Sequence, residues 1–192
     1  MGLSGEDTEK YYSVIGSEVE KLSEMVSEVI ELSKMESGNW KVDIQKWDLK
    51  DVILSTVEKF DKQFANSGFN VDCNIGDAWV YMDARRIEQV ISNFFSNALK
   101  YSDERKELRV YMEESGNGEI TVWIGNSGFL SEEDKERIWE RYYHGSEGSV
   151  MRLPSEGIGL DIVRTILRAH DSTYGNIQKD GMVYFYFSLK KA

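Results

Sequence analysis

The stretch SNFFSNALKY, from Ser92 to Tyr101, places polar side chains within what reads as a buried amphipathic helix. At about 100° per residue, Asn97 and Lys100 lie within roughly 40° of Asn93 around the helix axis. The apolar stripe next to them consists of Ile87, Val90, Phe94 and Ala98. Amides on such a border need partners, because an unmet buried polar group costs about 1 to 3 kcal/mol. The pattern therefore predicts that this helix faces either neighbouring loops or a cleft.

The types of residue on this border favour a ligand. Amide oxygens such as those of Asn93 and Asn97 suit a hard cation such as Mg²⁺, and an ammonium group suits the phosphates that accompany the cation. At about 4 Å and an effective dielectric of about 20, one contact between Lys100 and a phosphate contributes on the order of 4 kcal/mol before desolvation. Bonding of both amides to neighbouring loops stays the alternative at this point.

Two glycine-containing segments strengthen the ligand hypothesis. GNSG, Gly125 to Gly128, follows a strand pattern, and EGIGL, Glu156 to Leu160, opens a helix pattern. A glycine turn lets the backbone approach a flat ligand, and glycines at a helix start present free N–H groups to phosphate. One such segment is weak evidence. The chain has three such features in order: a polar helix, then a strand followed by glycine, then a glycine-containing loop before a helix. Together they are much more specific evidence for a ligand site.

Composition excludes several classes of function. The chain has 192 residues, enough for one domain with a core and a small appendage. Its net charge of −11 disfavours binding to nucleic acid or to an anionic membrane. Cys73 is the only cysteine, which excludes an internal disulfide, and its alternating surroundings predict a core thiol. No apolar run approaches the roughly 20 residues of a membrane span, so the chain is expected to be cytoplasmic.

Before the domain, a long helix is predicted over residues 6–36. Its apolar residues recur at steps of four and three, as in a coiled coil: Ile15, Val19, Leu22, Val26 and Val29. The alternative is a single amphipathic helix that lies on the domain. We expect two regions, residues 1–38 for this helix and residues 39–192 for the domain.

Within the domain, helices are predicted from Asp48 to Gly68, over residues 83–101, from Ser131 to about Arg141, and after Gly157. Strands are expected near residues 40–47, 69–75, 108–112, 120–124 and 182–189, and Asp180-Gly181 reads as a two-residue hairpin turn. Because neighbouring strands form hairpins, the sheet should be mixed and mostly antiparallel, with helices on one face. This is a two-layer α/β sandwich.

The ordered motifs resemble those of sensor histidine kinases. IEQVISNFFSNALKYS is similar to the family's N-box, VWIGNSG to the first glycine box, IWERYYHG to the F-box and EGIGLDIVRTILRAH to the second glycine box. Residues 11–38 resemble the second helix of the family's dimerisation and phosphotransfer hairpin. The resemblance implies the Bergerat ATP-binding fold, preceded by one long helix, with ATP and Mg²⁺ as ligands.

The resemblance also implies roles for individual residues. Asn97 matches the Mg²⁺ ligand, with Asn93 at the neighbouring N-box position, while Lys100 matches the phosphate-contacting lysine and Tyr101 flanks the nucleotide. Asn126 takes the place of the aspartate that accepts from the adenine amino group. The remaining matches are to the glycine boxes and the ATP lid: Gly128, Gly157, Gly159 and Leu160, and residues 142–156.

Some positions depart from the family pattern. No second glycine follows Gly128, Glu156 replaces a common glycine, and His144 replaces a usual arginine. The phosphoacceptor motif of the family, a histidine followed by an acidic residue on the first helix of the hairpin, does not occur in the chain, and His170-Asp171 lies instead at the end of the last predicted helix. His170 matches a structural histidine of the family, so we expect no catalytic residue in this chain.

We therefore expect the ATP-binding catalytic domain of a bacterial sensor histidine kinase, which binds Mg·ATP for transfer to a histidine elsewhere. Alone it should bind nucleotide without autophosphorylation. Expected partners are the phosphotransfer helix of a membrane-bound parent, its response regulator and, through the N-terminal helix, a second parent subunit. The alternatives are a degenerate regulatory pseudokinase and another Bergerat-fold ATPase or serine kinase.

Overall fold

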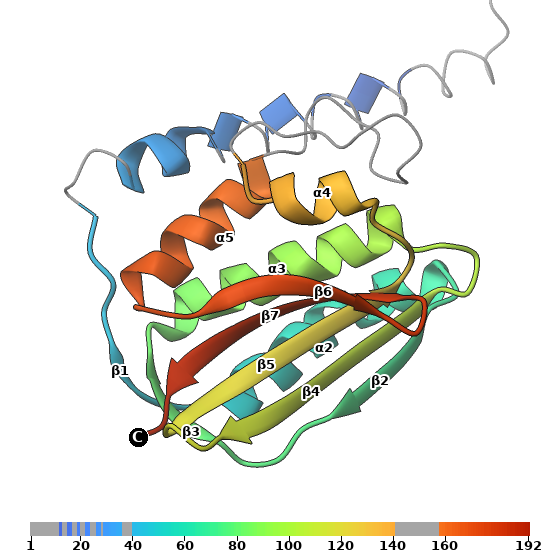
Figure 1. The fold of residues 1–192 in the computed structure, drawn as a ribbon. Helices are drawn as coiled ribbons and strands as arrows, with labels where there is room; N and C mark the ends of the chain where they lie inside the picture. The colour runs from blue at the N-terminus through green and yellow to red at the C-terminus, as the bar shows by residue number, and fades with distance from the viewer. Residues whose placement is uncertain are drawn as a thin grey trace, which may run out of the picture. The chain divides into compact units, whose positions relative to one another are not determined.

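The computed structural model describes residues 40–140 and 158–192 continuously (Figure 1). Nearer the N-terminus it describes residues 12, 15–16, 19, 22–23, 26–27 and 29–35. The chain divides into two compact units, Met1–Trp40 and Lys41–Ala192.

In the N-terminal unit, every described position from 12 to 35 is helical. This agrees with the helix predicted over residues 6–36, although its other positions and its predicted end at residues 36–39 lie outside the described residues. The five apolar side chains that recur at coiled-coil spacing are each more than half exposed: Ile15, Val19, Leu22, Val26 and Val29. None of the helices described in either unit is long and apolar enough to cross a membrane.

The larger unit contains two sheets. Its elements are, in chain order, β1 (Gln45–Asp48), α2 (Leu49–Asn66), β2 (Asn70–Asn74), β3 (Trp79–Met82), α3 (Ala84–Tyr101), β4 (Glu107–Ser115), β5 (Glu119–Ser127), α4 (Glu132–Arg137), α5 (Ile158–Ala169), β6 (Tyr174–Lys179) and β7 (Met182–Lys190). A five-stranded sheet has the order β2-β4-β5-β7-β6, and β1 pairs with β3. In the large sheet β2 and β4 are parallel, and the other three pairs are antiparallel. The predicted mixed, mostly antiparallel sheet is confirmed.

Helices α2, α3 and α5 cover one face of the large sheet (Figure 1). Phe94 of α3 stacks on Phe185 of β7 with ring centroids 5.0 Å apart, which joins helix to sheet. Phe64 of α2 meets Phe95 of α3 edge-on at 5.5 Å. Burial of each such ring contributes about 1.5 to 3 kcal/mol, so these contacts fix α3 between its neighbours. The architecture is the two-layer α/β sandwich predicted from the sequence.

The starts of α2, α3 and α4 were predictable because each carries a capping side chain. Asp48, Asp83 and Ser131 are the N-caps of α2, α3 and α4, and the side chain of each accepts a hydrogen bond from a backbone N–H of the first turn. Such a bond satisfies a donor that has no partner within the helix. After α2, Gly68 takes a positive φ of 73°, which suits the glycine predicted to end that helix.

Two strands, β3 and β6, were not predicted from the sequence, and several boundaries were misjudged. In β3, Trp79 and Tyr81 are about half exposed, while Val80 and Met82 are buried. Because large apolar residues occupy both faces of this strand, its sequence shows no alternation of apolar and polar residues. β1 begins later than residue 40, β2 ends at Asn74, and α4 ends at Arg137.

Candidate functional site

Helix α3 carries the polar border formed by Asn93, Asn97 and Lys100. Its buried residues are Ile87, Val90, Ile91, Phe94, Phe95 and Ala98. This stripe leaves Asn93 and Asn97 half-buried beside it, and Lys100 is exposed one turn beyond Asn97. Both amides therefore lie between core and surface, as predicted.

Asn93 lies where α3 meets the start of α5. Its amide nitrogen donates to the carbonyl oxygen of Gln89 over 3.0 Å. A Cβ atom added at Gly159 would lie 2.7 Å from Asn93 Oδ1, closer than real Cβ contacts come. Glycine at position 159 thus lets the first turn of α5, which also contains Leu160, approach the polar border. Gly157 and the predicted lid at residues 142–156, with His144 and Glu156, lie outside the described residues.

A cavity opens between α3, the end of β5 and β7. Counted with the solvent at its mouth, the hollow has a volume of about 350 Å³. It is lined by Asn97, Tyr101, Asn126, Phe129, Leu130, Val183 and Phe185. The structure therefore brings together residues that the sequence argument took from two separate motifs, the polar helix and the strand with glycine. Lys100 and Gly159 are not among the lining residues.

Asn126 is the buried polar group of this cavity, with 7% of its surface exposed. Its amide nitrogen donates to the carbonyl oxygen of Ser127 over 3.1 Å. That bond uses one of the two N–H donors of the amide and directs the nitrogen toward the backbone, which leaves the carbonyl oxygen as the end suited to accept from a ligand. An acceptor facing an amino group is the role that the sequence resemblance implies for this position.

Gly128 lies directly after Asn126 and Ser127 and needs to be glycine. Its φ is 156°, a conformation that residues with a side chain rarely adopt. An added Cβ atom would also lie 3.3 Å from the carbonyl oxygen of Tyr101. The glycine therefore lets the end of β5 pass close to the end of α3, which keeps Tyr101 and Asn126 at the same cavity.

Arg164 of α5 connects this helix to the segment after α4. Its guanidinium donates to the carbonyl oxygen of Trp139 at 2.7 Å and to the Asp161 carboxylate at 2.5 Å. The Trp139 indole N–H in turn donates to the side chain of Asn176 on β6 at 2.7 Å. These contacts attach Trp139, shortly before the predicted lid, to both α5 and β6.

Neither Cys73 nor His170 is placed for catalysis. Burial raises the pKa of the Cys73 thiol, which disfavours the nucleophilic thiolate. His170 Nε2 accepts from the backbone N–H of Asp83 at 3.0 Å, and Nδ1 lies 2.8 Å from the carbonyl oxygen of Ile166. Both ring nitrogens thus serve a structural purpose. Among the described residues no cluster of three histidine, cysteine or acidic side chains could hold a metal ion.

Four cavity residues were missed by the sequence argument: Phe129, Leu130, Val183 and Phe185. Alternation in the last strand could have shown that Val183 and Phe185 share a face. That this face meets Asn126 depends on the register between β5 and β7, which pairs Asn126 with Val183. No local signal in the sequence gives that register.

Comparison with known proteins identifies sensor histidine kinases that are similar to this chain. Residues 82–192 match the family model "Histidine kinase-, DNA gyrase B-, and HSP90-like ATPase". The sensor histidine kinase YcbM of Bacillus subtilis is 26% identical over 167 residues, which cover 85% of this chain and 53% of YcbM. This chain thus spans about half of that relative.

Solved structures agree on the fold. The Acinetobacter baumannii histidine kinase AdeS matches 99% of this chain and 86% of its own with a TM-score of 0.78 and 20% identity. Histidine kinase ThkA, in complex with the response regulator TrrA, matches the whole chain and 53% of its own with a TM-score of 0.80 and 22% identity. This chain belongs to the histidine kinase-, DNA gyrase B- and HSP90-like ATPase family, and it corresponds to the ATP-binding domain of sensor histidine kinases.

Proposed function

We propose that this domain binds Mg·ATP and presents its γ-phosphoryl group to a histidine on another segment of a sensor histidine kinase. The observation that carries the proposal is the cavity at which Asn97 and Asn126 meet. It joins an apolar lining, suited to a flat base, with two amides from separate elements. Such a combination of apolar walls and few polar groups is typical of small-molecule sites.

In this proposal the base lies in the cavity, where the carbonyl oxygen of Asn126 accepts from the adenine amino group. Tyr101 flanks the nucleotide at the end of α3. The phosphates extend toward Lys100 and toward the backbone of Gly157, Gly159 and Leu160. Free N–H groups at a helix start favour anions, and the exposed ammonium of Lys100 adds a positive charge for the phosphates.

Asn97 is the proposed Mg²⁺ ligand, with Asn93 as the second candidate. Mg²⁺ commonly binds one or two protein oxygens and completes its shell with phosphates and waters, so the residues present fit this ion. When bound, Mg²⁺ would neutralise charge on the phosphates during transfer. Asn97 is the better candidate because it lines the cavity, whereas Asn93 is not among the lining residues and its side-chain oxygen faces Gly159.

The acceptor histidine must lie outside this chain in our proposal. The chain has two histidines, of which His170 is bonded to backbone through both ring nitrogens. We infer that the domain positions the nucleotide and supplies charge, and that the parent supplies the nucleophile. A response regulator then receives the phosphoryl group, which is consistent with the solved complex of the relative ThkA with TrrA.

The N-terminal helix is proposed to belong to the parent's phosphotransfer hairpin, on the cytoplasmic side of a membrane-bound kinase. Its five exposed apolar residues at coiled-coil spacing fit a helix that pairs with others, including those of a second subunit. Two helices from each of two subunits would complete a four-helix bundle.

Calorimetry tests the proposal with Asn97→Ala. The wild-type chain should bind ATP more tightly with Mg²⁺ than with EDTA, and Asn97→Ala should remove that difference while its thermal midpoint stays near the wild-type value. Unchanged Mg²⁺ dependence in the variant would exclude Asn97 as the ligand. Absence of any binding at millimolar nucleotide would instead favour the degenerate regulatory module.

A second assay tests whether this chain itself contains a histidine that accepts the phosphoryl group. Labelled ATP should leave the isolated chain unlabelled. A stoichiometric, acid-labile phosphoprotein would contradict our view that the histidine is elsewhere.

A further inference from the structure

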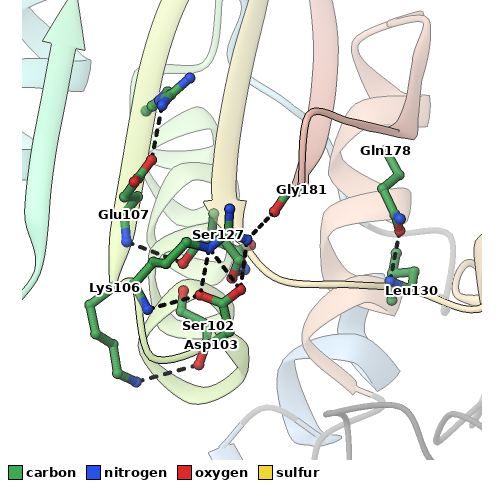
Figure 2. Close-up of polar contacts among 11 residues, drawn as sticks. Ser102, Asp103, Lys106, Glu107, Ser127, Leu130, Gln178 and Gly181 are labelled. Atoms are coloured by element: carbon green, nitrogen blue, oxygen red, sulfur yellow. Dashed lines mark hydrogen bonds and ion pairs between the residues drawn. The ribbon is translucent and has the colours of Figure 1, made fainter.

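The loop after β5 is held at two points by the β6–β7 hairpin. The backbone N–H of Gly128 donates to the carbonyl oxygen of Gly181 over 3.1 Å. The backbone N–H of Leu130 donates to the side-chain oxygen of Gln178 over 2.8 Å. Figure 2 shows the contact between Leu130 and Gln178. A single residue separates Gly128 from Leu130 in the loop. That residue is Phe129, so its backbone is fixed at both neighbours.

The hairpin that holds the loop is itself fixed. Asp180 and Gly181 have φ angles of 53° and 72°, which confirms the two-residue turn predicted from the sequence. The Gly181 carbonyl oxygen also accepts from Arg105 at 2.5 Å, and Arg105 is paired with Asp103 just after α3. The N–H of Asp103 donates to the Ser127 carbonyl oxygen at 3.1 Å. The ends of α3 and β5 and the turn between β6 and β7 thus form one connected framework.

Phe129 projects from this framework with an unusual exposure. Sixty per cent of its surface is exposed, whereas its neighbour Leu130 is only 4% exposed. Phe129 nevertheless lines the cavity that contains Tyr101 and Asn126. An exposed apolar ring that lines a cavity loses contact with water when a flat ligand enters, and this favours binding.

We propose that Phe129 is a binding residue for the nucleobase, and that Gln178 is the residue that positions it through Leu130. The inference rests on the proposed function, because it assigns the base of a purine nucleotide to this cavity. An apolar ring gains nothing from the phosphates, which need charge and N–H donors. Phe129 therefore contacts the part of the ligand that Asn126 also recognises, and it does so on the face of the base.

The first test separates base from phosphate with three ligands and Phe129→Ala. Calorimetry measures the dissociation constants of Mg·ATP, of adenosine and of Mg·tripolyphosphate. An aromatic stack on a base typically contributes about 1 to 3 kcal/mol, so ATP and adenosine should both bind roughly tenfold more weakly to the variant. Tripolyphosphate, which has no base, should bind both proteins equally, and Phe129→Trp should restore the affinity for ATP.

Tyr81→Ala is the matched control, since Tyr81 is also about half exposed but lies on β3 and outside the cavity lining. It should leave all three affinities unchanged. Wild-type affinity for ATP in Phe129→Ala would overturn the inference and leave the proposed function intact. An equal loss for tripolyphosphate would also overturn it. Failure of the wild-type chain to bind ATP would overturn both.

The second test concerns Gln178. Gln178→Ala removes the acceptor for the Leu130 N–H, and Gln178→Glu keeps an oxygen there. We expect a several-fold weaker affinity for ATP in the alanine variant and near wild-type affinity in the glutamate variant, at similar thermal midpoints. If Gln178 acts through Phe129, Phe129→Ala combined with Gln178→Ala should bind no more weakly than Phe129→Ala alone. Additive losses would refute the positioning role.

Discussion

Arg164→Ala is the substitution whose effect on folding follows most directly from the structure. The Arg164 guanidinium lies 2.5 Å from the Asp161 carboxylate, and these side chains are 18% and 2% exposed. Removal of one partner from a buried ion pair costs about 3 to 5 kcal/mol, because the remaining charge stays away from water. The partial exposure of Arg164 places the expected loss at the lower end, about 3 kcal/mol. The bond to the Trp139 carbonyl oxygen is lost as well.

The assay is urea unfolding followed by far-ultraviolet circular dichroism. In a thermal melt of a chain of this length, the same loss of about 3 kcal/mol in the free energy of unfolding lowers the thermal midpoint by roughly 6 to 12 °C. Arg168→Ala is the matched control on the same helix, since Arg168 is exposed and its hydrogen bond to the Tyr174 hydroxyl is 3.3 Å long. This control should change the free energy of unfolding by about 0.5 kcal/mol or less.

A double variant shows whether the pair is responsible. Asp161→Ala combined with Arg164→Ala removes both charges, so it should be more stable than the sum of the single losses predicts, by about 1 kcal/mol or more. The reasoning fails if Arg164→Ala costs no more than Arg168→Ala. It also fails if the single losses simply add.

Two further predictions concern other fixed points. Burial lowers the pKa of His170 in the folded chain. As the pH falls, the histidine is therefore protonated in the unfolded chain before it is protonated in the folded chain. The stability that neutral His170 contributes should be present above about pH 6.5 and decrease below it. Urea midpoints at pH 7.5 and 5.5 should therefore differ less in His170→Asn than in wild type. Gly181→Ala should lower the free energy of unfolding by about 1 to 2 kcal/mol, because its φ is 72° and its Cβ would lie 2.8 Å from Arg105. Urea unfolding checks this against Gly116→Ala, where an added Cβ meets nothing within 4 Å.

Local signals made much of this fold predictable. Asp48, Asp83 and Ser131 sit directly before apolar periodic segments, and each is an N-cap in the structure. The turn at Asp180-Gly181 needs two positive φ angles, which its residue types favour. These features depend on residues close together in the chain, so periodicity and turn chemistry are enough to find them.

The cavity was predictable only in part, because its walls depend on pairing between distant segments. Asn97 and Asn126 stood out because amides are unusual on an apolar border and beside a glycine turn. Val183 reaches the same cavity through the register of β7 on β5. Phe129 is placed by the Gly128 and Leu130 contacts with the β6–β7 hairpin, about 50 residues further along the chain, and nothing in the sequence near Phe129 indicates them.

The acceptor end of Asn126 is oriented from outside the cavity. The Ser127 carbonyl oxygen accepts both from the Asn126 amide and from the backbone N–H of Asp103, just beyond α3. The Asn126 amide therefore keeps one orientation for as long as the ends of α3 and β5 stay together, and Gly128 allows that approach. An aspartate accepts through either oxygen and needs no such orientation. With an amide at position 126, the recognition of the base that we propose depends on the framework that also holds Phe129, so both proposed contacts with the base should weaken together when that framework is loosened.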